Sequence, residues 1–358
     1  MSESFPRKIG KYRILRELGR GGQCTVYLGH DPFTRRTVAV KVAPPAMLSD
    51  PVAGGRFRNR FLKEASLAGR LDHPHIVKIF DAVLDDDIGY IVMEYVSGGS
   101  LRQFCSVAKL LPVEKVVEIA FKCCQALDYA NRHGVIHRDI KPANIMIHGD
   151  MDIKIADFGA AQFTLGDHTL FLGLVGSPAY MSPEQIRESE QTFKTDLYSL
   201  GVVMYELLTG RLPFLAENDF SLTYKIVNEE PVPIRVLRPD VPVSVEAIVQ
   251  RAMAKEEAQR FASWEEFAAA LAATFGQFRS ALAPLGEAEK FNIMRRLAFF
   301  RDFSDVELWE VLHFCYWRKF PAGRVLMKEG RIGSGIFLVV SGKVQSSRQG
   351  RSLGALGT

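Results

Sequence analysis

Apolar and polar positions alternate through residues 12–42, and glycine clusters together with the Asp31-Pro32 pair interrupt the alternation. A period of two is typical of half-buried strands, and glycine and Asp-Pro mark the turns between them. Residues 75–87 and 88–96 are strand-like as well, whereas residues 57–71 repeat with the period of a helix. We therefore expect the first 96 residues to form a sheet-rich lobe with one main helix.

The pattern becomes helical after the Ser97-Gly98-Gly99 segment. Residues 113–133 have a long amphipathic pattern that stops before Gly134, a residue suited to a helix C-terminus. Two short strand-like runs follow, and the chain is then mostly helical to about residue 273, with proline-rich breaks. From Phe320 onward short apolar runs and glycines return, which indicates a separate β-rich module.

The composition is that of an ordinary folded protein without a strongly charged surface. The 358 residues are 47% hydrophobic and 24% charged, and the net charge is +4, so we expect no nucleic-acid or membrane partner. The five cysteines form no CxxC pair, which favours a reducing compartment. The N-terminus lacks an apolar signal core, and Leu197–Leu208 is too short to span a bilayer, so a cytoplasmic location is expected.

Residues 134–159 carry polar groups at a spacing that a hydrophobic core does not need. A His-Arg-Asp triplet ends at Asp139, Asn144 lies five residues later, and Asp157 opens an Asp-Phe-Gly triplet after a second apolar run. Carboxylate and amide oxygens are ligands for hard cations, and a carboxylate can also accept a proton. The spacing therefore indicates a site that holds a metal ion and accepts a proton.

Three features upstream are suited to a polyphosphate. Gly19, Gly21 and Gly22 lie between two strand-like runs, where backbone without Cβ can approach phosphate oxygens, although a hairpin turn is the commoner reason for such a loop. Lys41 lies in an apolar run and needs an anion, which Glu64 on the next helix can supply. The alternatives are an edge-strand lysine and a solvated helix face, but the order of the three features favours phosphate binding.

Five motifs occur along the chain: "LGRGGQCTV", "VAVK", "HRDIKPAN", "DFG" and "GSPAYMSPE". In these motifs and their order, the chain resembles the eukaryotic-type serine/threonine protein kinases, which also occur in bacteria, over about residues 12–273. The resemblance implies an α+β fold of two lobes, with a β-rich N-lobe over 12–96 and a helical C-lobe over 97–273. The chain departs from the family at Cys24, where the glycine loop usually carries a third glycine.

The resemblance also implies an activity. Such an enzyme transfers the γ-phosphate of ATP to serine and threonine hydroxyls of proteins, itself included, with Mg²⁺, or with Mn²⁺ in its place. Asp139 would accept the proton of the hydroxyl, and Lys141 would contact the transferred phosphate. Asn144 and Asp157 would hold the metal ion, while His137 would be structural and pack under the Asp-Phe-Gly turn.

The positions that contact ATP follow from the same resemblance. The glycine loop and Lys41 would hold the phosphates, and Glu64 would pair with Lys41. Met93 would be the gatekeeper beside the adenine, and Glu94 and Val96 would offer backbone hydrogen bonds. The adenine ring would lie between four further side chains, which are also ordinary core residues: Leu18, Val26, Ala39 and Met146.

The activation segment, which follows the Asp-Phe-Gly triplet, contains two candidate phosphorylation sites. In the family, an arginine such as Arg138 pairs with a phosphorylated residue of this segment. Thr169 is the preferred candidate and Thr164 the second, and the alternative is that neither is modified. The segment departs from the family at Ser177, where threonine is common, and at Ser182, where alanine is common.

Two structural interactions in the C-lobe are implied as well. Glu184 would form a buried ion pair with Arg260. Asp196 would brace the backbone of the loop that carries Asp139.

Residues 274–296 are expected to form a helical linker. Residues 297–358 resemble the start of a cyclic-nucleotide-binding domain in "FFRDFSDVELWEVLHF", "FPAGRVLMKEG" and "GIFLVVSGKV". This resemblance implies a partial β-roll of regulatory origin. Because the chain ends before the family's ligand-binding cassette, we expect it to bind neither cAMP nor cGMP. A half-roll with open edges would be poorly stable or would form a homodimer through them.

Two other functions use the same fold. A non-catalytic scaffold would bind partners only, but Lys41, Glu64, Asp139, Asn144 and Asp157 are all present, which argues against it. A small-molecule phosphotransferase is the second alternative. The "HRDIKPAN" and "GSPAYMSPE" segments, which would position a peptide, argue against that reading and favour protein substrates.

Overall fold

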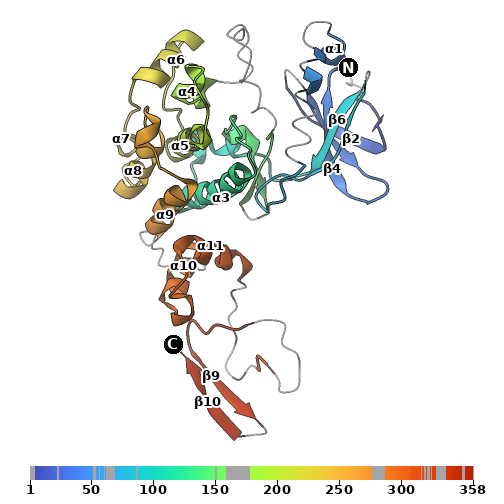
Figure 1. Ribbon diagram of the computed structural model, residues 1–358. Coiled ribbons are helices and arrows are strands. Elements are labelled where there is room, and N and C mark those ends of the chain that lie inside the picture. Colours follow the sequence, from blue (N-terminus) through green and yellow to red (C-terminus); the bar gives the residue numbers. More distant parts are fainter. Residues whose placement is uncertain are drawn as a thin grey trace. The chain divides into compact units, whose positions relative to one another are not determined.

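The computed structural model divides into two units, Met1–Leu271 and Ala272–Thr358 (Figure 1). It describes residues 5–21, 24–50, 54–55, 57–59, 61, 69–85, 88–149, 151–158, 178–275, 287–315, 317, 320, 323, 325–327, 336–348 and 351–357. Five residues named above therefore lie outside the described residues: Gly22, Glu64, Thr164, Thr169 and Ser177.

The first lobe of the larger unit is a six-stranded antiparallel sheet with the order β1-β2-β3-β4-β6-β5. Its strands are β1 Lys8–Ile9, β2 Tyr12–Arg20, β3 Thr25–His30, β4 Thr37–Ala43, β5 Ile79–Leu84 and β6 Gly89–Glu94. The alternation seen in the sequence arises because successive side chains point to opposite faces. The expected sheet-rich lobe is confirmed.

The two faces of this sheet have separate hydrophobic clusters. Val38, Val40 and Val92 pack on one face. On the other face, Ile91 packs with Leu48 of the short helix α1 Pro45–Leu48 and with Phe61 of the predicted helical region. Both faces of the sheet therefore carry buried apolar side chains, and a one-residue slip would exchange the two clusters.

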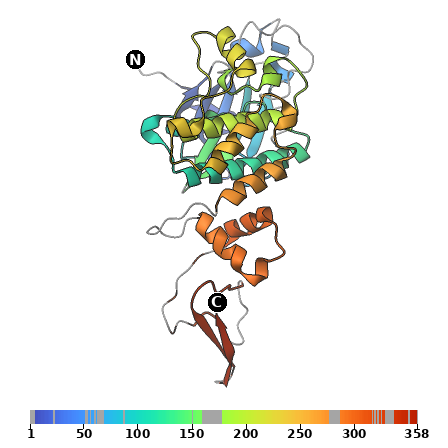
Figure 2. The same ribbon diagram turned by 90° about the vertical axis from the view of Figure 1, so that its left-hand side faces the viewer.

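The second lobe is mainly helical. Its helices are α3 Val113–Arg132, α4 Pro183–Ile186, α5 Phe193–Thr209, α6 Asp219–Asn228, α7 Ile234–Leu237, α8 Val243–Ala252 and α9 Trp264–Thr274. Helix α3 matches its prediction, and Gly134 follows it with a φ of 73°. Helices α3 and α5 lie side by side (Figure 2). In the described parts of the chain, no helix is long and apolar enough to cross a lipid bilayer.

Gly210 at the end of α5 shows why a glycine is required there. Its φ is 70°, in the left-handed region that side chains with a Cβ rarely adopt. A Cβ at this position would also lie 2.3 Å from the backbone nitrogen of Val107. The close approach fixes the helix end against the segment that precedes α3.

A small hairpin contacts the segment that leaves the first lobe, and residues of the candidate site lie at one end of it. Strands β7 Ile145–His148 and β8 Asp152–Ile155 pair antiparallel. The N–H of Gly98 donates to the carbonyl of Ile147 at 3.0 Å, and the N–H of Ile147 donates to the carbonyl of Gly99 at 2.8 Å. The segment that leaves the first lobe is thus held against β7.

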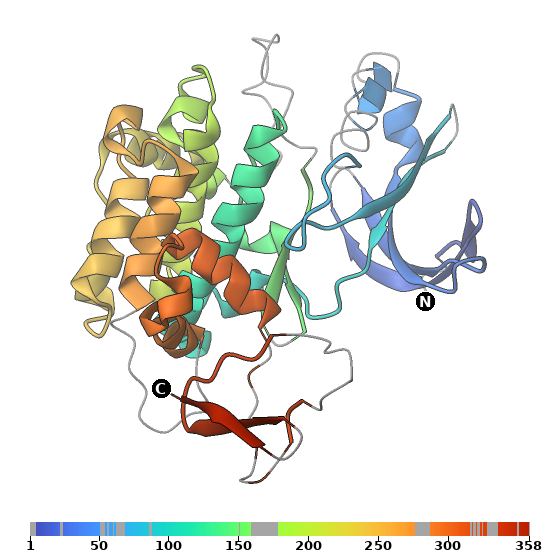
Figure 3. The same ribbon diagram turned by 60° about the horizontal axis from the view of Figure 1, so that its bottom comes forward.

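The second unit contains helices α10 Glu287–Arg296 and α11 Asp305–Phe314. Phe275 stacks on Trp309 of α11 with ring centroids 4.3 Å apart. Strands β9 Lys343–Arg348 and β10 Arg351–Gly357 form an antiparallel hairpin, coloured dark red in Figure 3.

One strand expectation in the second unit is wrong in part. The apolar run "GIFLVV" belongs to the module expected to be β-rich, but residues 336–339 lie in no strand and β9 begins only at Lys343. A strand needs a partner for its backbone groups, and no strand in the described ranges pairs with residues 336–339. The β-roll itself stays a prediction.

Candidate active site

The β7–β8 hairpin brings the ends of the polar stretch together. Ile145 pairs with Ile155 in the hairpin. The N–H of Ala156 then donates to the carbonyl of Asn144 at 2.8 Å. As a result, Asn144 just before β7 and Asp157 just after β8 lie at the same end of the hairpin.

Asp139 lies in a polar cluster with Lys141 and Asn144. The ammonium of Lys141 is 2.7 and 2.9 Å from the two carboxylate oxygens of Asp139. Nδ2 of Asn144 donates to the backbone carbonyl of Asp139 at 2.8 Å and to its carboxylate at 3.0 Å. Both partners can only accept, so the amide orientation is set by chemistry and the carbonyl Oδ1 of Asn144 points elsewhere.

Lys41 connects the sheet of the first lobe to this cluster. Its ammonium lies 2.9 Å from Oδ1 of Asp157, although the two residues are 116 positions apart in the sequence. Burial alone would raise the pKa of the Asp157 carboxyl, but the nearby ammonium outweighs it, and the pKa is lowered. Asp157 is therefore a carboxylate at neutral pH.

The oxygen atoms of this cluster fit a magnesium ion. Within the described ranges, no donor bonds Oδ1 of Asn144 or Oδ2 of Asp157. One is an amide carbonyl and the other a carboxylate oxygen, and hard oxygen ligands of this kind are what Mg²⁺ takes, usually one or two per site. Both come from one end of the same hairpin.

His137 is held as a structural residue. Its Nε2 lies 2.9 Å from the carbonyl of Ala156, which can only accept, so this nitrogen carries the hydrogen. The other ring nitrogen, Nδ1, accepts the N–H of Asp139 at 3.2 Å. The ring meets Phe158 edge-on, with centroids 4.8 Å apart. The expectation that His137 packs under the Asp-Phe-Gly turn is confirmed.

Asp196 of α5 binds the backbone of the loop that carries Asp139, as expected. Its carboxylate accepts the backbone N–H of His137 at 2.7 Å and that of Arg138 at 2.6 Å. Arg138 has a φ of 63°, an unusual conformation for a side chain with a Cβ. Burial raises the pKa of Asp196, although the two N–H groups favour its charged form. The loop conformation thus depends on two acceptors from one buried carboxylate.

We expect Asp196→Asn to lower the free energy of unfolding by about 1–3 kcal/mol, because an amide NH₂ then faces a backbone N–H that has lost its acceptor. Chemical denaturation of both proteins measures the difference. The exposed Asp219→Asn is the control and should change stability by less than about 0.5 kcal/mol. Equal stability of Asp196→Asn and the wild type would contradict the bracing role.

The ion pair between Glu184 and Arg260 is confirmed. The two guanidinium nitrogens lie 2.8 and 2.9 Å from the two carboxylate oxygens, and Arg260 and Glu184 are only 1% and 4% exposed. Burial would raise the pKa of Glu184, but the bonds from Arg260 outweigh it and the pKa is lowered. Thr195 donates a further hydrogen bond to Glu184 at 3.0 Å.

The residues expected around adenine are partly brought together. Directly paired residues share a sheet face, and the pairs Val26–Lys41 and Ala39–Met93 place three of them, Val26, Ala39 and Met93, on one face together with Lys41. The N–H of Glu94 already donates to the carbonyl of Lys78 at 2.8 Å, so a contact from Glu94 to adenine would use its carbonyl oxygen. The remaining positions come from β2, from the segment after β6 and from β7: Leu18, Val96 and Met146.

Two contacts of the site were not expected from the sequence. Ser182 caps α4 in a capping box with Gln185, and Gln185 also donates from Nε2 to the carbonyl of Arg138 at 2.9 Å. The Ser-x-x-Gln spacing before a helix was the available signal. Tyr180 donates to Glu206 at 2.6 Å, and the sequence offers no local signal for this pair.

Comparisons with known proteins agree with this geometry. A family model described as "Protein kinase domain" matches residues 12–269. A probable serine/threonine-protein kinase of Streptomyces coelicolor is 39% identical over 292 residues, which are 78% of this chain and 42% of that protein. The serine/threonine-protein kinase PrkC of Bacillus subtilis is 39% identical over 272 residues, 75% of this chain and 41% of PrkC. PknB of Mycobacterium leprae is 37% identical over 273 residues, 74% of this chain and 43% of PknB. The chain thus spans less than half the length of these curated relatives.

Proposed function

This chain belongs to the protein kinase domain family, and we propose that it is a serine/threonine protein kinase that transfers the γ-phosphate of ATP to hydroxyls of proteins. The observation that carries the proposal is the convergence of Asp139, Lys141 and Asn144 with the Lys41–Asp157 pair. The three relatives are serine/threonine kinases by name, which supports serine and threonine, rather than tyrosine, as the residues that receive the phosphate.

The chemistry divides among the residues of the cluster. Asp139 accepts the proton of the incoming hydroxyl, because its carboxylate is hydrogen-bonded to Lys141 and Asn144, which we assign to the transferred phosphate and to the metal ion. Lys141, bonded to that carboxylate, contacts the transferred phosphate and offsets its charge. Asn144 and Asp157 would hold Mg²⁺ through their open oxygens, and the bound ion would neutralise charge that develops between the β- and γ-phosphates. Lys41 holds the other phosphates from the sheet side.

The nucleotide positions extend this proposal. The glycines Gly19, Gly21 and Gly22 would lie over the phosphates, and Glu64 would pair with Lys41. The shared face of Val26, Ala39 and Met93 supports an adenine site there. The set is completed by Leu18, Glu94, Val96 and Met146.

Transfer of radiolabelled phosphate from [γ-³²P]ATP to a generic protein substrate tests the activity. We expect labelled phosphoserine and phosphothreonine with the wild type, and a loss of at least about 10²-fold with Lys41→Met, because the methionine cannot pair with phosphate. A scaffold would label nothing, and a small-molecule phosphotransferase would consume ATP without labelling protein. Either result would refute the proposal.

Autophosphorylation of the activation segment is the regulatory part of the proposal. Arg138, held by Asp196 and Gln185, would pair with phosphate on Thr169 or, as second choice, Thr164. Mass spectrometry after incubation with ATP and Mg²⁺ should find phosphate on one of the two threonines. An active enzyme with neither threonine phosphorylated would remove this part and leave the catalytic proposal intact.

We propose that residues 297–358 form a partial cyclic-nucleotide-binding-like module. The β9–β10 hairpin after helices α10 and α11 supports it. Pairing through open edges of this hairpin would make a homodimer, and sedimentation at several protein concentrations would detect it. We also propose a reducing, cytoplasmic compartment, in which the five cysteines, Cys24, Cys105, Cys123, Cys124 and Cys315, remain thiols and form no disulfide with one another.

A further inference from the structure

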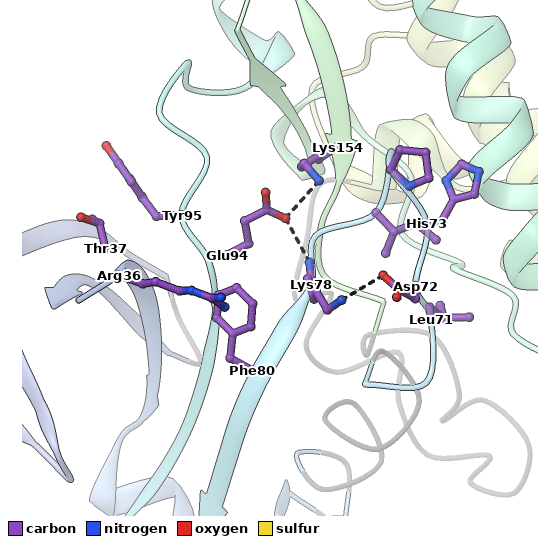
Figure 4. A pocket seen from close by; sticks show the side chains of 12 residues that line it. Arg36, Thr37, Leu71, Asp72, His73, Lys78, Phe80, Glu94, Tyr95 and Lys154 are labelled. Atoms are coloured by element: carbon purple, nitrogen blue, oxygen red, sulfur yellow. Dashed lines mark hydrogen bonds and ion pairs between the residues drawn. The ribbon is translucent and has the colours of Figure 1, made fainter. Parts of the chain in front are cut away.

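A cavity of about 500 Å³ lies behind the strand that carries the gatekeeper position (Figure 4). Met93 shares the face of Ala39 and Lys41, and the next residue of β6, Glu94, points to the opposite face and lines the cavity. A volume of about 300–1,000 Å³ is common for small-molecule sites. None of the residues proposed for catalysis or metal binding lines this cavity.

Most charges in the cavity wall are already paired. Lys78 lies 3.0 Å from Asp72, and Lys154 lies 3.0 Å from Glu94 (Figure 4). His73 contributes no charge near neutral pH, because burial together with the charges of His75 and Lys154 lowers its pKa to about 4. These groups leave the wall neutral apart from one residue.

That residue is Arg36. Its guanidinium lies over the ring of Phe80, 5.7 Å from the centroid, and no carboxylate in the described ranges pairs with it. The five N–H donors of a guanidinium form a planar fork that matches the two oxygens of a carboxylate or phosphate. The cavity therefore has one unpaired positive charge at its rim and a geometry suited to an acidic group.

The floor of the cavity is apolar. Leu71 and Ile76 line it and are almost fully buried, and the Phe80 ring adds a partly exposed aromatic face beside Arg36. Apolar walls with a few oriented polar groups are typical of ligand sites. Phe80 can contact a flat ligand body while the guanidinium above it binds the head.

We propose that this cavity binds a small organic acid, with its carboxylate or phosphate on Arg36 and its apolar body against Phe80, Leu71 and Ile76. The site lies on the other side of β6 from the proposed adenine face, so it is separate from the catalytic cluster. Its occupancy does not depend on phosphate transfer, and the two proposals can fail independently.

The test is ¹⁹F NMR of the full chain without ATP, with 4-fluorobenzoate and 4-fluorophenyl phosphate as probes and the uncharged 4-fluorobenzamide as control. We expect saturable shifts or line broadening for the acids. Arg36→Gln should weaken their binding about tenfold or more, since a hydrogen-bonded charge pair is lost. Arg35→Gln is the matched control, because Arg35 is exposed and does not line the cavity; it should bind the acids as the wild type does.

The tighter of the two acids identifies the head group that the site prefers, and either order supports the proposal. Three results would overturn it: no saturable binding of either acid, equal binding of the amide, or equal effects of Arg36→Gln and Arg35→Gln. The last result would mean that the acids respond to surface charge in general. Equal melting temperatures of the three proteins establish that the variants are folded.

Discussion

Asp139→Asn should lower the kcat of phosphate transfer by about 10²–10⁴-fold, the range by which general acid–base groups contribute. The amide cannot accept the proton of the hydroxyl. It also ends the pairing of the carboxylate with Lys141, whose ammonium lies 2.7 Å away. The KM for ATP should change much less, because Asp139 is not expected to contact the nucleotide. Initial rates of labelled phosphate transfer at several ATP concentrations separate the two constants.

Asp128→Asn is the matched control for this change. Asp128 is on α3 and pairs with Arg132, whose side chain is largely exposed, so its replacement should leave kcat within about twofold because a surface pair contributes little. A kcat of Asp139→Asn within a few-fold of the wild type would show that another group accepts the proton, and the assignment of Asp139 would be wrong.

Arg260→Leu should lower the free energy of unfolding by about 3–5 kcal/mol, because it leaves the buried carboxylate of Glu184 without its cation. For a domain of this size the loss corresponds to a fall in Tm of roughly 6–20 °C. The guanidinium also donates to the carbonyls of Lys194 and Ala254 at 2.9 and 2.8 Å, and these acceptors lose a partner as well. Thermal and urea unfolding measure the effect.

Arg132→Leu, the control, removes a surface pair with Asp128 and should lower the free energy of unfolding by less than about 1 kcal/mol.

The pH dependence of the stability is a second check. The pKa of Glu184 is lowered in the folded chain, so its pairing stabilises the fold above the ordinary carboxyl pKa and is lost as the pH falls through the lowered value. The stability difference between the wild type and Arg260→Leu should therefore shrink in acid. Similar losses for both arginine variants at pH 7 would contradict the buried pair.

The sequence predicted those parts of the site that are set by local spacing. Asp139 and Asn144 could be placed together because they are five positions apart in one loop, and Asp157 because a short hairpin connects it to Asn144. The Ser-x-x-Gln pattern at Ser182 could have predicted a helix cap. Helix α3 was predicted to within one residue because its amphipathic pattern ends at a glycine.

The remaining contacts depend on tertiary packing that local spacing does not encode. Lys41 meets Asp157 across 116 residues, and only the assembled lobes determine that distance. Residues 336–339 have a strand-like composition but lie in no strand, since pairing depends on a partner elsewhere. The cavity behind β6 is lined by residues from several separate segments, and no single stretch of the chain indicates it.

We expect Lys41, Asn144 and Asp157 to surround one metal-bound triphosphate beside Asp139. A crystal structure of the chain with Mn²⁺ and a non-hydrolysable ATP analogue tests it most directly, because anomalous scattering locates the ion. We expect the anomalous peak within ligand distance of Oδ1 of Asn144 and the carboxylate of Asp157, with the Lys41 ammonium on a phosphate oxygen. A peak bound by other residues, or a triphosphate that Lys41 does not contact, would contradict the account.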